Sequence, residues 1–285
     1  MARVTTLRLS PSALALDWSL VATRIKRFIR NYIEKSGMKG IVLGVSGGLD
    51  SSTTAALASQ AIGGSKVLAL SMPEEETYNP EDTKHIEMLA EEFDFQVETI
   101  DISQILRACY DSLPLYSREE IRSKGNLKAR IRMVCWYYYA NILQRIVCGN
   151  SDKSETMMGY YTKWGDVAAD ISPLMDLYKT QVKQLAAHIG VPREIITKPP
   201  TPALWPGQTA EGEMGIKYET LDLILLGLET FLSPEEIARQ LKLPLKLILD
   251  TKARLLANVH KRRMPLTTKL GYRTVGKDFR LPYMS

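Results

Sequence analysis

The residues whose types and spacing most clearly suggest a chemical function lie at positions 41–52, which read IVLGVSGGLDSS. An apolar run is followed by Ser, Gly and Asp residues and then by a helix-forming segment at 53–61. This order predicts a strand, a tight turn and the start of a helix. Small turn residues let backbone N–H groups approach a ligand closely, and a helix N-terminus carries partial positive charge. The segment therefore predicts an anion site, most simply one for phosphate.

The turn differs from a Walker A loop in its charge. A Walker A loop places a Lys after its last glycine, whereas residues 49–52 here read LDSS. A carboxylate beside a polyphosphate is repulsive unless a metal lies between them, and Mg²⁺ is the hard cation that accompanies phosphates. We therefore expect Asp50 to bind Mg²⁺, and Ser46, Ser51 and Ser52 to donate hydrogen bonds to phosphate. The alternative is a plain strand–helix turn in which Ser51 or Asp50 caps the helix.

The loop SGGLDSS resembles the PP-loop of the ATP pyrophosphatases. Enzymes of this group cleave ATP between its α and β phosphates and pass AMP to an acceptor. They include NAD, GMP and asparagine synthetases and several tRNA-modifying enzymes. The resemblance implies an α/β fold, adenine nucleotide alpha hydrolase-like and Rossmann-like, with ATP and Mg²⁺ at the loop.

Further segments resemble one branch, the ammonia-dependent NAD synthetase family, in the same order and at similar spacing. They are GNLKARIRM (125–133), KSETMMGYYTKWGD (153–166), DISPLMDLYKTQV (170–182), KPPTPALWPGQTAEGEMG (198–215) and HKR (260–262). GMP synthetases share the loop but lack the KARIRM and YYTKWGD segments. The resemblance implies a ligase that forms a C–N bond in the last step of NAD biosynthesis. Its reaction amidates nicotinic acid adenine dinucleotide (deamido-NAD) with ammonia through an adenylated intermediate, releasing AMP and pyrophosphate.

The resemblance also implies roles for individual residues. It assigns Mg²⁺ to Asp50 and Glu155, and catalysis to Asp50, Lys179 and Asp166, the last of which would help to receive ammonia. The positions that would bind ATP are Gly44, Val45, Ser46, Gly47, Gly48, Leu49, Asp50, Ser51, Met72, Asn150, Lys179 and Thr201. Those that would bind deamido-NAD are Arg130, Lys163, Asp170, His260 and Lys261.

Each of these side chains also has an ordinary structural interpretation. Glu155 and Lys179 could be solvated helix residues, His260 a surface histidine and Met72 a core residue at a strand end. The chain also departs from the family pattern at two places. Asn150 stands where Thr is usual, and Val167-Ala168 replaces a Gly-Gly pair. Neither departure removes a charge, so we expect them to alter local geometry rather than the reaction.

The elements that must position these residues alternate between strands and helices, which is typical of a doubly wound parallel sheet. We expect about five strands, flanked by helices. A long loop rich in Pro and Gly, at 199–215, is expected to be functional. The predicted strands are 41–45, 66–72, 96–100 and 145–148, and the predicted helices are 14–35, 51–62, 80–93, 127–143, 180–189, 218–228, 234–241 and 244–258.

The length allows one α/β domain or two small ones, and the resemblance implies one NAD synthetase domain over residues 1–285, without a glutaminase domain, because the PP-loop begins near residue 44. The expected nitrogen source is free ammonia, unless a separate glutaminase supplies it. The modest net charge of +5 does not require nucleic acid, and no apolar run is long enough for a membrane. Three widely spaced cysteines without a Cys-x-x-Cys pair are typical of reduced thiols in a cytoplasmic protein. The resemblance further implies a homodimer, with the helix at 127–143 at its interface.

Two alternatives remain open from the sequence. One is a non-catalytic nucleotide-binding protein, favoured only by the departures at Asn150 and Val167-Ala168. The other is a tRNA-modifying ATP pyrophosphatase. The missing cysteine pairs and the modest charge weigh against the tRNA-modifying enzyme.

Overall fold

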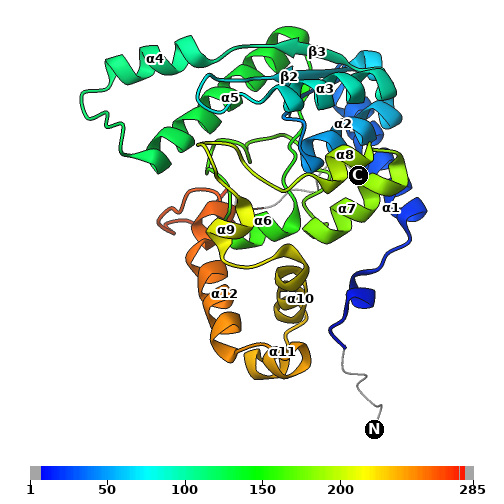
Figure 1. Ribbon diagram of the computed structural model, residues 1–285, viewed down its shortest axis with the longest axis vertical. Helices are drawn as coiled ribbons and strands as arrows, with labels where there is room; N and C mark the ends of the chain where they lie inside the picture. Colours follow the sequence, from blue (N-terminus) through cyan, green and yellow to red (C-terminus); the bar gives the residue numbers. More distant parts are fainter. Residues whose placement is uncertain (1–7, 276, 280–285) are drawn as a thin grey trace.

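A parallel four-stranded sheet organises the chain in the computed structural model, which describes residues 8–275 and 277–279 (Figure 1). Its strand order is β3-β2-β1-β4, and every neighbouring pair is parallel. The carboxyl ends of all four strands therefore meet at one edge. The strands are β1 (Ile41–Val45), β2 (Val67–Ser71), β3 (Gln96–Thr99) and β4 (Ile146–Val147).

Both faces of the central strands are buried, which explains why these segments are almost entirely apolar. Ile41, Leu43 and Val45 point to one hydrophobic cluster, and Val42 points to another on the opposite face. The first face is covered by helices α1 (Trp18–Ser36), α2 (Leu49–Ile62), α3 (Pro80–Phe93) and α7 (Lys179–Ile189). The opposite face is covered by α4 (Ser103–Ser112) and α5 (Ile121–Leu143).

A third cluster forms a helical layer beyond the sheet, at the bottom of Figure 1. Its helices are α6 (Lys153–Met158), α10 (Tyr218–Glu229), α11 (Pro234–Leu241) and α12 (Leu245–Ala257). The shorter elements are α8 (Arg193–Thr197), α9 (Ala210–Met214) and the 3-10 turns η1 (Pro11–Leu14), η2 (Gly64–Lys66) and η3 (Val259–Arg262).

The expected α/β class and parallel sheet are confirmed, but the count of about five strands is wrong for the described residues, which contain four. The nearest candidate for a fifth is a single bridge between Cys148 and Ile171. The first helix begins at Trp18 rather than at position 14, because Asp17 caps its first turn by accepting a hydrogen bond from Leu20 N. The expected loop at 199–215 contains the short helix α9.

The three cysteines are free, and Cys148 is buried at the end of β4. Burial raises the pKa of its thiol, which keeps it unreactive. Among the described residues, no helix is both long and apolar enough to cross a membrane.

Candidate active site

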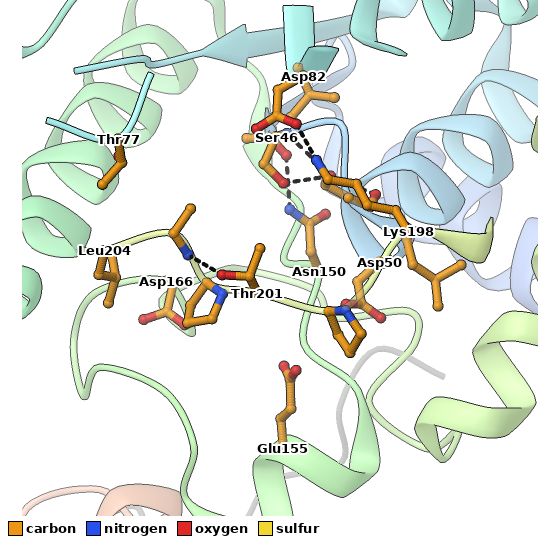
Figure 2. Close-up of a pocket in the computed structure, with 18 of the residues that line it drawn as sticks. Ser46, Asp50, Thr77, Asp82, Asn150, Glu155, Asp166, Lys198, Thr201 and Leu204 are labelled. Carbon is orange, nitrogen blue, oxygen red and sulfur yellow. Dashed lines mark hydrogen bonds and ion pairs between the residues drawn. The ribbon is translucent and has the colours of Figure 1, made fainter. Parts of the chain in front are cut away.

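A cavity of about 360 Å³ lies at the carboxyl edge of the sheet, where parallel α/β folds bind their ligands. The segments after β1, β2 and β4 all contribute to its lining, as do α7 and the segment 198–204. Figure 2 shows side chains from these segments surrounding the opening. Residues far apart in the sequence therefore meet here because the sheet is parallel.

The loop between β1 and α2 forms one wall of this cavity. Gly47 has a φ of +66°, and a Cβ there would lie 2.8 Å from the Asp82 carbonyl oxygen, so only glycine fits. Gly48 is the N-cap of α2, which directs the helix N-terminus to the cavity. The hydroxyl oxygens of Ser46 and Ser51 lie 3.2 Å apart beside it. Hydroxyl and helix N–H donors thus gather at one point, as an anion site requires.

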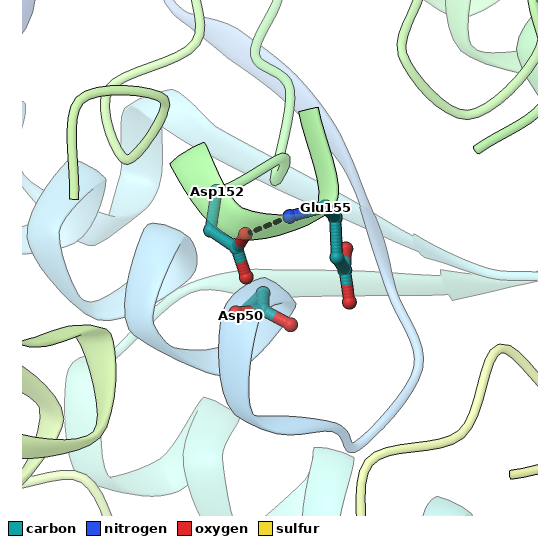
Figure 3. Close-up of side chains that lie close together, drawn as sticks. All are labelled: Asp50, Asp152 and Glu155. Atoms are coloured by element: carbon teal, nitrogen blue, oxygen red, sulfur yellow. Dashed lines mark hydrogen bonds between the residues drawn. The ribbon is translucent and has the colours of Figure 1, made fainter. Parts of the chain in front are cut away.

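Three carboxylates converge on a single ammonium group beside this loop. Lys179 Nζ lies 2.6 Å from Asp50 Oδ2, 2.7 Å from Asp152 Oδ2 and 2.8 Å from Glu155 Oε1. The Lys179 side chain is only 5% exposed and Asp152 is fully buried. Figure 3 shows the three acidic side chains pointing toward one another from α2 and the start of α6. The residues therefore form a compact charged centre.

Burial and like charge set the protonation preferences of this centre. Burial raises the pKa of Asp50, and it raises the pKa of Asp152 well above its usual value, because removing a carboxylate from water penalises the charged form. Burial alone would lower the pKa of Lys179, but the three carboxylates raise it well above its usual value. The ammonium therefore stays charged and holds the carboxylates together.

The same oxygens suit a divalent cation. One oxygen from each of Asp50, Asp152 and Glu155 lies within 4.8 Å of the others. Asp50 Oδ1 is buried and has no hydrogen-bond donor in the described part of the chain, so it is free to take a ligand. Hard carboxylate oxygens in this number fit Mg²⁺. The donor set is therefore compatible with the metal expected from the sequence.

Asp152 is a member of this centre that the sequence interpretation missed. It is the N-cap of α6, and its Oδ1 accepts a hydrogen bond from Glu155 N at 2.8 Å. The signal was present in the sequence as an Asp three residues before a Glu, a few residues after a buried strand. That spacing is common at ordinary helix starts, so only the fold distinguishes it here.

The buried carboxylate of Asp222, in the helical layer, connects the first turns of α6 and α7. Asp222 on α10 accepts a hydrogen bond from Ser154 Oγ at 2.5 Å and from Thr180 N at 2.9 Å. Ser154 Oγ in turn accepts one from Lys179 N at 2.9 Å. The backbones that carry Glu155 and Lys179 are therefore fixed relative to each other.

Asp166 lines the same cavity and is labelled in Figure 2. Its carboxylate accepts a hydrogen bond from Thr162 N at 2.8 Å. The Asp166 side chain is exposed to the cavity, but the cavity walls limit how much water reaches its carboxyl group. This desolvation raises the pKa of Asp166 to about 6. Asp166 is thus able to change its protonation state near neutral pH.

The segment 198–209 closes another side of the cavity. Lys198 forms an ion pair with Asp82, and Thr201 Oγ1 donates to the Gln208 carbonyl oxygen at 2.7 Å. Asn150 Nδ2 donates to the Gly44 carbonyl oxygen at 2.9 Å, which links the ends of β4 and β1. The expected loop therefore folds over the site with its own hydrogen bonds.

The residues expected to hold ATP and metal are brought together by the fold. All of them line the cavity except two: Gly47, which packs against α3, and Ser52, which is fully buried in α2 and does not reach the cavity, so the expectation that it binds phosphate is wrong. Asp166 lines it too, whereas none of the five residues expected to hold deamido-NAD does.

Those five residues lie outside the cavity and are only partly assembled. Arg130 on α5 is exposed and donates to the Lys163 carbonyl oxygen at 3.2 Å. Lys261 Nζ donates to the Gly159 and Tyr161 carbonyl oxygens at 2.6 and 2.7 Å.

The other two are Asp170 and His260. Asp170 Oδ2 accepts from Val147 N at 2.7 Å, and His260 is exposed in η3. The cavity at the carboxyl edge of the sheet therefore collects none of the five.

Comparison with known proteins agrees with this arrangement. The NAD synthase family model matches residues 21–265. An NH(3)-dependent NAD(+) synthetase of Methanocaldococcus jannaschii is 47% identical over 251 residues, covering 88% of this chain and 96% of that protein.

Solved structures point the same way. An NMN synthetase from Francisella tularensis superposes with a TM-score of 0.79 at 30% identity, covering 90% of this chain and 100% of that one. An NH3-dependent NAD synthetase from Campylobacter jejuni gives 0.76 at 30% identity with the same coverage. The chain described here belongs to the NAD synthase family.

Proposed function

We propose that this protein amidates deamido-NAD with ammonia at the expense of ATP, as a C–N bond-forming ligase in the last step of NAD biosynthesis. The observation that carries the proposal is the cavity in which the β1–α2 loop, three carboxylates and Lys179 meet. Family membership and the identity to NH(3)-dependent relatives support it. The two steps use groups that face this cavity.

In the first step, the nicotinate carboxylate of deamido-NAD attacks the α-phosphorus of ATP. A new O–P bond forms, the bond from the α-phosphorus to the bridging oxygen breaks, and pyrophosphate leaves with that electron pair. Ser46, Ser51 and the N-terminus of α2 bind phosphate oxygens, and Lys179 neutralises charge on the transferring group. Such preorganised donors stabilise the transition state because they need no rearrangement.

In the second step, ammonia attacks the activated carbonyl carbon and AMP leaves. The proton that the new amide nitrogen loses must go to a base. We assign this role to Asp166, and its position in the cavity lining and its pKa, raised to about 6, support the assignment. Its carboxylate also hydrogen-bonds incoming ammonia and so orients it.

Mg²⁺ is the metal that we assign to this site, held by Asp50 and Glu155, with Asp152 as a further ligand. When bound, it neutralises phosphate charge that the carboxylates would otherwise repel. Lys179 would then be available to the transferring phosphate. The residues expected to contact ATP beyond the loop are Met72, Asn150 and Thr201, all of which line the cavity.

The acceptor half of the site is completed, in our proposal, by a second copy of the chain. Arg130, Val134, Tyr138 and Ile142 are exposed and lie one helical turn apart on α5, so they form one stripe. An exposed apolar stripe of this kind is typical of a subunit interface. Arg130 at its end would place deamido-NAD at the edge of a homodimer, with Lys163, Asp170, His260 and Lys261.

We further propose that residues 1–285 act as one NAD synthetase domain that takes ammonia free or from a separate glutaminase, with no nucleic-acid or membrane partner. Three free cysteines support a reducing compartment, the cytoplasm.

An assay for NAD tests the function directly. Purified protein is supplied with ATP, Mg²⁺, ammonium and deamido-NAD, and NAD and AMP are measured. We expect both products to form in equal amounts. Similarity to an NMN synthetase makes nicotinate mononucleotide the acceptor to compare, and we expect a lower kcat/KM with it.

The outcomes separate the alternatives. Absence of both NAD and the adenylated intermediate would overturn the proposal and favour a non-catalytic nucleotide-binding protein. ATP–pyrophosphate exchange that requires tRNA and ignores deamido-NAD would instead favour a tRNA-modifying enzyme.

A further inference from the structure

Lys128 is a fully buried cation behind the wall of the ATP cavity, outside the centre around Lys179. Its side chain on α5 is 1% exposed. Its Nζ donates to Glu74 Oε1 at 2.8 Å, to Glu76 Oε2 at 2.6 Å and to the Leu204 carbonyl oxygen at 2.9 Å. An ammonium has three N–H donors, so all three are used.

The three acceptors belong to two segments that line the cavity. Glu74 follows β2 and also accepts from Thr77 Oγ1 at 2.6 Å and from Glu76 N at 3.0 Å, so it shapes the turn 74–77. Leu204 belongs to the segment 198–209, across the opening from the β1–α2 loop. Thr77 and Leu204 both line the cavity, and both are labelled in Figure 2. Lys128 thus joins two walls that have no strand or helix in common.

The hydrogen bond from Lys128 to the Leu204 carbonyl oxygen is not needed to neutralise the charge of Lys128. Two carboxylates already balance the Lys128 ammonium, and Glu76 pairs with Lys124 as well, at 3.1 Å. The third N–H instead satisfies a carbonyl of an irregular segment. Within that segment Leu204 N donates to Gln208 Oε1 at 2.9 Å, and Ala203 has a φ of +46°. A left-handed non-glycine residue persists only where its surroundings hold it.

We propose that Lys128 is a positioning residue that fixes the segment 198–209 and the turn 74–77 against each other, and thereby sets the affinity for ATP. The inference depends on the proposed function only for the identity of the nucleotide. Lys128 itself does not line the cavity, so its effect is transmitted through Leu204 and Glu74.

Three variants test the proposal. Lys128→Met removes the charge and all three hydrogen bonds while keeping an unbranched apolar chain. Lys124→Met is the matched control, because Lys124 lies one turn away on α5 and pairs with Glu76 but does not bond Leu204. The double variant Lys128→Met/Glu74→Gln also removes the buried carboxylate that the single variant leaves unpaired, so it separates loss of stability from loss of position.

The measurements are hydrogen exchange of peptides from 199–209, the Kd of Mg-ATP by calorimetry without deamido-NAD, and steady-state kinetics. We expect Lys128→Met to speed exchange in this segment and to raise the Kd and the KM for ATP about tenfold, the size expected when a charge-assisted hydrogen bond is lost. The KM for deamido-NAD and the kcat at saturating ATP should change less than about twofold. The double variant should regain thermal stability but keep the weak ATP binding, and Lys124→Met should match the unmodified protein in both.

The proposal is overturned if the double variant binds ATP like the unmodified protein, since Lys128 would then only neutralise Glu74. It is also overturned if exchange in 199–209 is the same in all variants. The exchange measurement needs no ligand, so a protein that forms no NAD would contradict the proposed function while leaving this test intact.

Discussion

The proposed ATP half and the proposed acceptor half of the site are built in different ways. The ATP half is complete within one chain, since the β1–α2 loop, Asp50, Glu155 and Lys179 line one cavity. The acceptor half is scattered, with Arg130 and His260 exposed on separate elements. The edge of a parallel sheet therefore brings the residues expected to bind phosphate and metal together within one chain.

Burial follows the same division. Lys179 and Asp152 are almost entirely removed from water, so each depends on the other for charge balance. Lys163 and Arg130 keep contact with solvent and interact through a backbone carbonyl. We therefore expect substitutions in the ATP half to alter stability and catalysis together. Those in the acceptor half should alter only binding.

The largest effect is expected for Lys179→Met in the metal-free protein. Three carboxylates would be left without a cation, which we expect to cost about 3–5 kcal/mol of unfolding free energy. Thermal unfolding with and without Mg²⁺ measures it, and Mg²⁺ should restore part of the loss because it binds the folded state. Lys183→Met, one turn along α7 and exposed, is the control. Equal stability of both variants would show that the carboxylates are held otherwise.

The next effect is expected for Asp50→Asn. Loss of a metal ligand should cost about 3 kcal/mol or more of transition-state stabilisation, as for other preorganised electrostatic contacts. This corresponds to a decrease of roughly a hundredfold in kcat/KM. Steady-state kinetics across a Mg²⁺ titration measure it, and the fold should persist because Lys179 keeps two carboxylates. Asp176→Asn, whose exposed carboxylate pairs with Lys153 at 2.7 Å, should be nearly silent. Near-normal turnover of Asp50→Asn would place the metal elsewhere.

Tyr138→Glu tests whether the acceptor half needs a second subunit. A charge in the α5 stripe should split the dimer, raise the Kd for deamido-NAD about tenfold and leave that for ATP unchanged. Light scattering and calorimetry measure the two effects. Leu115→Glu introduces the same charge at a residue 97% exposed outside the stripe and serves as control. A dimer that persists in Tyr138→Glu, or an unmodified protein that is a monomer, would contradict the shared site.

The smallest effect is expected for the pH dependence that Asp166 contributes. Its folded-state pKa of about 6 lies above the ordinary 3.8, so its protonation stabilises the fold at low pH and this contribution is lost as pH rises through 6. The carboxylate form acts in catalysis, so kcat should fall below pH about 6. Asp166→Asn should lower kcat and abolish the decrease of kcat below pH about 6. The free energy of unfolding should also vary less between pH 4 and 6 in this variant. If kcat of the variant still decreased below pH about 6, that decrease would have to come from another titrating group.

Much of the framework followed from residue patterns alone. The bounds of β1, α3 and α11 match the expected ranges because apolar periodicity and capping residues mark them locally. The β1–α2 loop was recognisable because its function depends on consecutive small residues. The expected count of about five strands was one too high for the described residues, which contain only the four strands whose ranges were named, and Ile171 adds no more than a single bridge to Cys148.

The site was less predictable wherever it depends on distant partners. Lys128 stands inside an ordinary helical sequence, and its meaning comes from Glu74 and Leu204, which are 54 and 76 residues away. Asp152 resembled any helix cap until the fold brought Asp50 and Lys179 beside it.

Residue types at short spacing were enough to indicate the turn between β1 and α2, the buried strands and the family. The tertiary structure decided which charges share a cavity, since parallel pairing of β1, β2 and β4 brings their carboxyl ends to one edge. It also decided which charges are paired. Burial makes an unpaired ion costly, so the positions of Lys179 and Lys128 are set by carboxylates that only the fold could place within reach.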